Sequence, residues 1–589
     1  MIMLINKKIK SVSLFSVFFL LVLVIISACS DSSQRDTFDS KKSVQKIENQ
    51  QAVAMPDEFA ANIAMDILNK GGNAVDAAIA AQFSLAVTFP EAGNIGGGGF
   101  MLIHYDKQDD FIDYRESAPG LAHRDMYLDE NGEVKRLESL FGVLASGTPG
   151  TVSGMWEAHK KYGTLPWADL VQPAYTLSKE GFIMPEALAS KIKRYIDRLE
   201  KREITVNFKD YFGHARTGEL FVQAELADTL LRIKEAGKKG FYEGETAKII
   251  SRFMEQKGGL INQDDLLKYQ AKWRKPIKSK WRQYEVISAA PPSSGGIAVA
   301  QWLQMFDIVK ARSPELNLND AQYIHVLAEI GKRVFADRAE YLGDPDFIDV
   351  PQKALLTSEY IQERAHSIQL DKISISEDIK PGLAESEQTT HFSIVDAMGN
   401  AVSNTTTINL GFGSGVVVEG GGFLLNDEMD DFSAKAGVPN YFGAIGGQAN
   451  EIQPYKRMLS SMTPTIVLEN NEIKMVTGSP GGTTILSSVY LSILHALEFN
   501  LPAQQVVDQP RFHHQLLPKN EIRYHEGLST DVLTELEALG YSTRKSRFGD
   551  LHVIIKNKGK LEAASETNGR GKALVQSSTI VQTITEETF

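Results

Sequence analysis

The sequence contains a single cysteine, Cys29, and it lacks the short motifs of the commonest nucleotide, hydrolase and zinc enzymes. One cysteine cannot form a disulfide within the chain, even in an oxidising compartment. No P-loop, GxSxG elbow, HExxH pair or paired CxxC is present, so no motif indicates a nucleotide-binding, α/β-hydrolase or zinc enzyme. Adjacent histidines rarely chelate one ion, and we interpret His513 and His514 as hydrogen-bonding structural residues. No metal and no organic cofactor is expected.

The chain also lacks an excess of basic residues. It has 62 Lys and Arg against 74 Asp and Glu, which gives a formal net charge of -12 at pH 7. Phosphate backbones bind to basic surfaces, so nucleic acid is not expected as a partner and any basic site must be local. With 43% hydrophobic and 23% charged residues, the composition is typical of a folded globular protein.

An apolar stretch near the amino terminus, from Leu14 to Ile26, is too short to span a membrane. Lysines precede it and small residues follow it, which is typical of a secretory signal. Cys29 directly follows IISA, and ISAC resembles the bacterial lipoprotein signal, in which the cysteine is lipidated. We therefore interpret residues 1–28 as a lipoprotein-type signal peptide and Cys29 as the lipidation site. The alternative is an ordinary signal peptide followed by an unrelated cysteine.

The residues after Cys29 bear on localisation. In the resemblance to lipoproteins, Ser30 rather than Asp favours the outer membrane. We expect an exported, periplasmic protein that is lipid-anchored to the outer membrane of a Gram-negative bacterium. Residues 29–50 are polar and charged throughout, which predicts a flexible tether.

From residue 51 onward no repeat or low-complexity break separates domains, so one continuous body is expected. Asp57 can cap a first helix that ends at Gly71 and Gly72, and an alanine-rich helix follows. Residues 151–260 are mostly helical by period, whereas the chain after Thr389 is rich in strand patterns. Stacked layers of helices and sheets are therefore predicted.

The stretch QTTHFSIVD contains an unusual candidate nucleophile, Thr389. A threonine hydroxyl is weak unless a base removes its proton, and a free α-amine at a chain start can be that base. The α-amino pKa is about 8, against about 10.4 for lysine, so a useful fraction is neutral at pH 7. Two threonines before a strand are also ordinary β composition, and this is the only role that we assign to Thr390.

Three other patterns could complete such a site. The glycines of GSPGG precede a helix, so the N–H groups of Gly481 and Gly482 could form an oxyanion hole, although a simple strand-to-helix turn has the same sequence. Acidic residues in NDEMDD form what is usually a solvated loop. Together with an arginine and two serines, these acids could instead bind a zwitterion.

Taken together, these motifs resemble the γ-glutamyltransferase family, also called γ-glutamyltranspeptidases, of the N-terminal-nucleophile hydrolases. The resemblance covers about residues 50 to 575. It is carried, in the family's order, by GGNAVDAA, GNIGGGGF, DYRESAP, PPSSGG, FADRAEYLGDPDF, TTHFSIVD, GNAVSNTTTIN, LLNDEMDDFSAK, KRMLSSMTPT, GSPGG and PRFHHQ.

The resemblance implies a stacked αββα fold and an inactive precursor that cuts itself between Gln388 and Thr389. The products would be a large subunit, residues 51–388 behind the tether, and a small catalytic subunit, residues 389–589, which stay together as a heterodimer. Thr389 would attack glutathione or another γ-glutamyl compound, with Gly481 and Gly482 as the oxyanion hole. The γ-glutamyl group would pass to water or to an amino acid or dipeptide acceptor.

The resemblance also implies the roles of the remaining site residues. The α-carboxylate of the glutamyl group would be held by Arg115, Ser460 and Ser461. The α-amine would be held by Asn409, Glu428 and Asp431. Thr407 would hydrogen-bond the nucleophile and assist maturation.

Two departures from the family pattern concern this pocket. Some bacterial members have Gln where this chain has Glu428, whereas others have Glu. Residues 435–457 resemble a lid over the glutamyl pocket, but the bacterial lid tyrosine aligns with Phe442, and Tyr441 stands one place earlier. Phenylalanine cannot hydrogen-bond Asn409, so the gate should differ in detail.

Two alternatives stay open on the sequence. A cephalosporin acylase of the same superfamily would prefer a glutaryl group, which lacks the α-amine that the acids of this chain would bind. A surface lipoprotein could also keep the fold for binding alone. The presence of Thr389, Thr407, Arg115 and GSPGG argues against a purely binding role.

Overall fold

The computed structural model describes residues 42–135, 137–375, 379, 389–435, 447–567 and 569–585. The chain divides into a large unit, residues 48–578, and a small unit of residues 1–47 and 579–589. Within the small unit, residues 42–47 and 579–585 are strand. The predicted signal peptide, Cys29, Gln388, Tyr441 and Phe442 lie outside the described residues.

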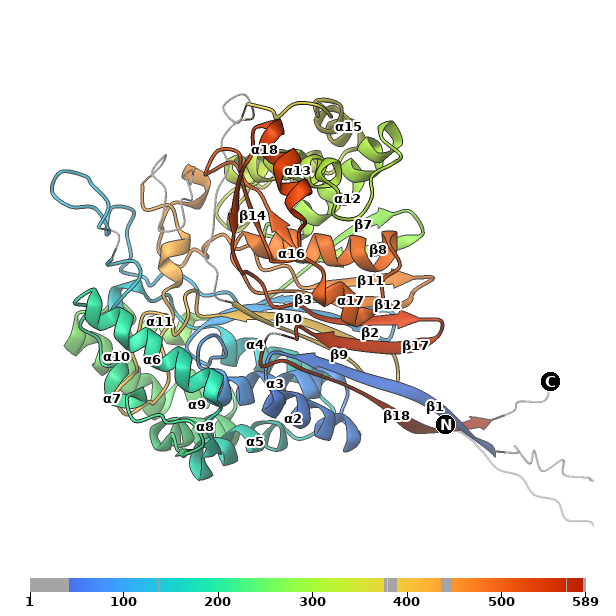
Figure 1. Cartoon of the computed structure of the whole chain (residues 1–589). Helices are drawn as coiled ribbons and strands as arrows, with labels where there is room; N and C mark the ends of the chain where they lie inside the picture. The colour runs from blue at the N-terminus through green and yellow to red at the C-terminus, as the bar shows by residue number, and fades with distance from the viewer. Residues whose placement is uncertain are drawn as a thin grey trace, which may run out of the picture. The chain divides into compact units, whose positions relative to one another are not determined.

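Two β-sheets lie at the centre of the large unit (Figure 1). The first has the order β18-β1-β9-β10-β2-β3-β6. Its strands are β1 (Lys42–Met55), β2 (Gly98–Tyr105), β3 (Gln108–Asp113), β6 (Lys272–Arg274), β9 (Thr389–Val395), β10 (Ala401–Thr407) and β18 (Lys572–Thr585). The second has the order β17-β16-β12-β11-β8-β7. Its strands are β7 (Ile277–Trp281), β8 (Tyr284–Ser288), β11 (Thr465–Glu469), β12 (Glu472–Thr477), β16 (His552–Asn557) and β17 (Lys560–Ser565).

Helices cover the outer face of each sheet (Figure 1). The helices on the side of the first sheet are α2 (Glu58–Asn69), α3 (Ala74–Thr88), α4 (Thr151–Tyr162), α5 (Trp167–Glu180), α6 (Glu186–Lys201), α7 (Phe208–Phe212), α8 (Ala224–Ala236), α9 (Lys239–Tyr242), α10 (Gly244–Lys257) and α11 (Gln263–Lys268). Those on the side of the second sheet are α12 (Gly295–Arg312), α13 (Ala321–Tyr341), α14 (Gln352–Leu355), α15 (Ser358–His366), α16 (Thr484–Ile493), α17 (Ala503–Asp508) and α18 (Thr530–Leu539).

Short elements complete the described chain. They are the 3-10 turns η1 (Val143–Ala145), η2 (Glu428–Asp431) and η3 (Gln448–Asn450), the π-helical turn η4 (Leu494–Glu498), and the strands β4 (Phe182–Ile183), β5 (Leu220–Phe221), β13 (Phe512–His513), β14 (Glu521–Tyr524) and β15 (Ser542–Lys545).

Alternation along the strands explains the layers. On β2, Phe100 and Leu102 join the core that includes the second sheet, whereas Met101 and Ile103 join the core that includes α2 and α3. Successive side chains of a strand point to opposite faces, so β2 is apolar on both. Both faces of the first sheet are therefore buried, and the predicted αββα stack is confirmed.

The hairpin of β9 and β10 positions the candidate nucleophile. The two strands pair antiparallel, and the register places Thr389 opposite Thr407. Asp396 and Asn400 close the turn at the other end through a backbone hydrogen bond of 2.9 Å. Thr389 is thus the first residue of β9, at the end of the sheet away from the turn.

One predicted segment is wrong. Residues 42–50 belong to strand β1 rather than to a flexible tether. Their polar side chains predict disorder, but β1 lies between β18 and β9 in the sheet, and strand pairing can satisfy backbone groups that a polar sequence would otherwise leave to water. A pairing partner more than 500 residues away leaves no local signal in the sequence.

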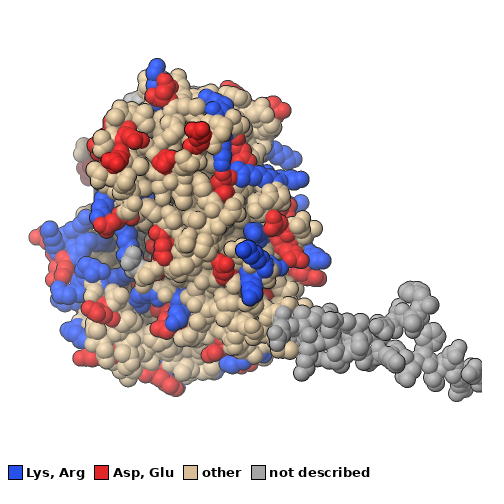
Figure 2. All heavy atoms as spheres, turned by 45° about the vertical axis from the view of Figure 1, so that its right-hand side comes forward, with Lys and Arg blue, Asp and Glu red and all other residues tan. Residues whose placement is uncertain are grey.

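The described part of the chain contains no helix that is long and apolar enough to cross a membrane. On the face drawn in Figure 2, acidic and basic side chains both occur, so the excess negative charge is not gathered into one acidic surface there.

Helix α3 provides a test of the local structure, because all of its residues are buried and a capping box starts it. The Asn73 side chain accepts hydrogen bonds from Val75 N at 2.9 Å and Asp76 N at 3.0 Å. We expect Asn73→Ala to lower the free energy of unfolding by about 1 to 2 kcal/mol, since an N-cap acceptor is lost. Asn73→Ser keeps an acceptor and should lose clearly less in urea denaturation. Equal losses in the two variants would contradict the assigned cap.

Candidate active site

The hydroxyls of Thr389 and Thr407 meet at the open end of the hairpin. Thr389 Oγ1 donates to Thr407 Oγ1 across 3.4 Å, and Asn409 N donates to the same Thr407 oxygen at 2.8 Å. Thr407 therefore links the candidate nucleophile to the loop that carries Asn409. Asn409 has a φ of 70°, a left-handed conformation that asparagine tolerates better than most residues.

The loop GSPGG reaches this end of β9 because its first glycine has no side chain. A Cβ atom on Gly478 would lie 2.3 Å from the ring of His391. The His391 ring is itself fixed by Thr405 Oγ1 at 2.9 Å and Ser393 Oγ at 3.1 Å. Burial holds the pKa of His391 well below its usual range, with His552 lowering it further, so the ring is neutral. His391 was not predicted from the sequence, because an isolated histidine in a strand carries no signal.

Gly481 and Gly482 precede helix α16 with φ values of 131° and 60°, where glycine is favoured. Their carbonyls begin the helix by accepting from Thr484 N at 3.1 Å and Ile485 N at 3.0 Å. Among the described residues, neither glycine N–H has an acceptor. These two donors at a helix start can therefore stabilise a developing negative charge, as predicted for an oxyanion hole.

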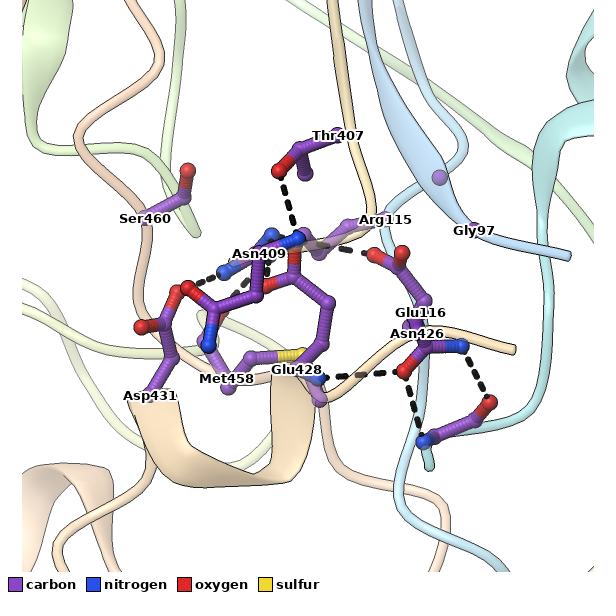
Figure 3. Close-up of polar contacts among 12 residues, drawn as sticks. Gly97, Arg115, Glu116, Thr407, Asn409, Asn426, Glu428, Asp431, Met458 and Ser460 are labelled. Atoms are coloured by element: carbon purple, nitrogen blue, oxygen red, sulfur yellow. Dashed lines mark hydrogen bonds and ion pairs between the residues drawn. The ribbon is translucent and has the colours of Figure 1, made fainter. Parts of the chain in front are cut away.

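A buried cluster of charges surrounds Arg115, which follows β3 and is 1% exposed (Figure 3). Its Nη1 lies 2.6 Å from a Glu428 oxygen, and its Nη2 pairs with Asp431. The carbonyls of Met458 and Leu459 each accept from the guanidinium at 3.5 Å. Three segments that are distant in sequence therefore meet at one side chain.

A third carboxyl, that of Glu116, lies 3.7 Å from Arg115 Nη1. Sequence reasoning does not identify it, because an acid next to an arginine usually indicates a solvent-exposed pair. Burial raises the pKa of Glu116 to about 8 against the attraction of Arg115. Burial likewise raises the pKa of Glu428 well above its usual range. Burial beside other acids therefore favours the protonated forms of Glu116 and Glu428.

A second buried arginine, Arg338 of α13, was also missed. Burial lowers its pKa to about 9, while Asp431 opposes this shift and Arg115 adds to it. Arg338 is 1% exposed and donates from Nε to Ser294 Oγ at 3.0 Å. Asp431 therefore interacts electrostatically with Arg338 as well as with Arg115.

The predicted residues converge on one narrow cavity of about 10 Å³. Its lining residues are Arg115, Thr389, Thr407, Asn409, Glu428, Asp431, Ser460, Ser461, Met462, Gly482 and Ile485. Gly481 is next to the lining without being part of it. The structure thus places the candidate nucleophile, an oxyanion donor and the charged groups in one site.

Two features differ from the simple assignment of one charge to one ligand group. Glu428 and Asp431, predicted to bind an amine, are paired with Arg115, predicted to bind a carboxylate. A zwitterionic ligand could exchange with these pairs, because it brings one charge of each sign. Ser461 Oγ is buried and has no hydrogen-bond partner among the described residues, so it is ready to donate to such a ligand.

The histidine pair lies in the interior, as interpreted from the sequence. His513 Nδ1 is 2.8 Å from Ser487 Oγ, and His514 Nδ1 is 2.7 Å from the Glu521 carbonyl. Within the described ranges, no group of three or more His, Cys, Asp or Glu is arranged to hold a metal ion.

Comparison with known proteins assigns the architecture to a family. The fold is similar to that of a cephalosporin acylase from Bacillus halodurans, with a TM-score of 0.78 at 25% identity over 92% of this chain and 98% of that one. The Gamma-glutamyltranspeptidase family model matches residues 60–576. The chain belongs to the γ-glutamyltranspeptidase family.

Individual relatives are similar over most of their length. A glutathione hydrolase proenzyme of Pseudomonas aeruginosa is 49% identical, with 94% of this chain and 97% of that protein covered. One from Escherichia coli is 45% identical, with 87% and 90% covered. A solved γ-glutamyltranspeptidase from Pseudomonas nitroreducens is 49% identical with a TM-score of 0.54, covering 56% of this chain and 97% of that one.

The charge cluster predicts a pH-dependent effect of Arg115→Gln. Removing the cation leaves buried acids unpaired, so we expect a loss of about 3 kcal/mol of stability near neutral pH. Without the cation, the carboxyl pKa values that are already raised will rise further. A carboxyl with a raised pKa in the folded state contributes stability below its unfolded pKa, and this contribution is lost as the pH rises through the folded pKa. The thermal midpoint should therefore fall furthest below wild type at pH 8 and least at pH 5.

Arg124→Gln is the matched control, because the Arg124 side chain is 65% exposed and pairs with Asp125 at the surface. It should leave the midpoint close to wild type at both pH values. A deficit for Arg115→Gln that grows toward pH 5 would contradict the assigned charges.

Proposed function

We propose that this chain is an autoprocessed γ-glutamyltransferase and glutathione hydrolase with Thr389 as its nucleophile. The observation that carries the proposal is the position of Thr389 at the first residue of β9, in one cavity with Arg115, Glu428 and Asp431. Membership of the family and relatives named glutathione hydrolase proenzyme support the same activity.

Maturation would use the same hydroxyl as catalysis. Thr389 Oγ1 attacks the carbonyl carbon of Gln388, the peptide C–N bond breaks, and water hydrolyses the resulting ester. This step leaves a carboxylate at the end of the large subunit and a free α-amine on Thr389. The two subunits, residues 51–388 and 389–589, would remain associated because strands of both lie in the same sheets.

In turnover, the new α-amine accepts the proton of Thr389 Oγ1, which forms a bond to the γ-carbonyl carbon of the donor. The carbonyl electron pair moves to its oxygen, where the Gly481 and Gly482 N–H groups donate to it. When the C–N bond breaks, the leaving amine takes the proton and a γ-glutamyl ester remains. Water then releases glutamate, or the amine of an amino acid or dipeptide acceptor forms a new γ-glutamyl product.

The charged residues would select the glutamyl group. Arg115, Ser460 and Ser461 hold its α-carboxylate, and Asn409, Glu428 and Asp431 hold its α-amine. A donor that lacks the amine leaves buried acids without a cation, a loss that costs a binding site much more than a missing methylene does. This reasoning disfavours the glutaryl preference of an acylase, although the fold alone would accommodate either.

The processing step is tested with Thr389→Ala. We expect purified wild type to give two fragments on a denaturing gel, with Thr389 at a new amino terminus by mass analysis. The variant should give one fragment of precursor size and hydrolyse L-γ-glutamyl p-nitroanilide at least about 1000-fold more slowly, because no nucleophile remains.

Thr390→Val is the matched control, since Thr390 is buried in β9 and has no role in the proposed chemistry. It should be cleaved and active. An uncut but active wild type would overturn the mechanism, while hydrolysis of glutaryl p-nitroanilide in preference to the γ-glutamyl compound would favour the acylase. A processed but inactive wild type would favour a binding protein.

We also propose that the protein is exported to the periplasm and anchored to the outer membrane through lipid on Cys29. The support is the ISAC sequence and the polar residues that follow it. Cells fed a radiolabelled fatty acid should label the wild-type protein and not Cys29→Ser, which should also leave the membrane fraction. Continued labelling of Cys29→Ser would refute the anchor, and Ser33→Ala serves as a control that should label normally.

A further inference from the structure

The segment PPSSGG, residues 291–296, has no part in the proposed chemistry, yet it lies directly behind the serines of the site. It connects β8 to α12, and both of its serines are fully buried. Ser293 forms a parallel bridge with Ser460. The Ser460 N–H donates to the Pro292 carbonyl at 2.8 Å, and the Ser294 N–H donates to the Ser460 carbonyl at 2.8 Å.

The hydroxyls of Ser293 and Ser294 also donate to carbonyls of the segment that contains Ser460 and Ser461. Ser294 Oγ donates to the Ser460 carbonyl at 3.0 Å, and Ser293 Oγ donates to the Met462 carbonyl at 2.7 Å. The intervening Ser461 carbonyl accepts from Thr463 Oγ1 at 2.7 Å. Three successive carbonyls are thereby fixed, which leaves the Ser460 and Ser461 side chains to line the cavity.

Close packing prevents this contact from shifting. A Cβ atom on Gly295 would lie 2.4 Å from Thr463 Oγ1, so the start of α12 approaches Thr463 as closely as glycine allows. The buried segment and the serine pair therefore behave as one rigid unit.

Arg338 completes the arrangement from a third element. Its Nε donates to Ser294 Oγ at 3.0 Å, and the same hydroxyl donates its only proton to the Ser460 carbonyl. A hydroxyl that accepts from a guanidinium is a stronger donor, because hydrogen bonds in a chain polarise one another. The chain of hydrogen bonds from Arg338 through Ser294 to Ser460 thus connects α13 to the edge of the cavity.

We propose that Ser294 and Arg338 are positioning residues that orient the Ser460 and Ser461 hydroxyls and so determine how tightly the enzyme holds an α-carboxylate. This inference rests on the proposed function of the site. Neither residue lines the cavity, and the hydrogen bonds that connect them to it run from Arg338 to Ser294 and from Ser294 to the Ser460 carbonyl. Their loss should weaken binding of the glutamyl group more than it slows the chemistry at Thr389.

The test compares Ser294→Ala with Ser288→Ala. Ser288 is also a buried serine, and its hydroxyl donates to the Pro464 carbonyl at 3.1 Å, just beyond the serine pair. For Ser294→Ala we expect KM for L-γ-glutamyl p-nitroanilide and the Kd of L-glutamate by calorimetry to rise about tenfold, the size of one hydrogen bond to a charged group. The kcat should stay within about threefold, because the nucleophile and oxyanion donors are unchanged.

Arg338→Lys is a second variant that leaves PPSSGG intact, keeps a positive charge and removes the guanidinium whose Nε donates to Ser294. It should raise KM and Kd in the same direction, and combining it with Ser294→Ala should raise them by less than the product of the single effects. If Ser294→Ala does not fold, the KM and Kd of Arg338→Lys alone test the positioning role.

The outcomes separate the two proposals. Wild type that fails to hydrolyse the anilide overturns the proposed function. Active wild type, with KM and Kd in both variants no higher than in Ser288→Ala, overturns the positioning role alone. A fall in kcat at constant KM also overturns it, because the residues would then act on the chemistry.

Discussion

The burial of one guanidinium constrains the whole site. Arg115 is removed from water, and the acids and carbonyls that compensate it, apart from Glu116, come from segments more than 300 residues further along the chain. A buried charge without partners costs several kcal/mol, so these segments must be held where they are. The layered fold does this by bringing the end of β3, the η2 turn and the segment with Met458 and Leu459 together.

The candidate nucleophile is positioned by the same architecture from another direction. The β9 and β10 pairing places Thr389 opposite Thr407, and the hydrogen bond from Asn409 connects this pair to the loop that leads toward η2. Gly478 lets the GSPGG loop lie against His391, two residues along β9 from Thr389. The candidate nucleophile, the Gly482 N–H group and the charge cluster therefore meet at one cavity.

Much of the architecture could be predicted because its signals are local. The Asp57 cap, the alanine-rich helix α3 and the helix after GSPGG follow from capping chemistry and composition, and the structure confirms them. Strand β1 was mistaken for part of a tether, because its stability comes from pairing with β9 and β18. Ser294 and Arg338 were overlooked for the same reason, since neither residue type nor spacing indicates a contact between α13 and the loop after β8.

The sequence by itself determined the chemical types in the site: a threonine that can start a chain, glycines before a helix, an arginine, and acids and serines in motifs that resemble one family. Only the tertiary structure decided that Glu428 and Asp431 pair with Arg115, that Glu116 joins them as a raised-pKa acid, and that PPSSGG supports the serine pair. The physical reason is that charge pairing and pKa depend on distance and burial, and these are set by packing between segments that are far apart in the chain.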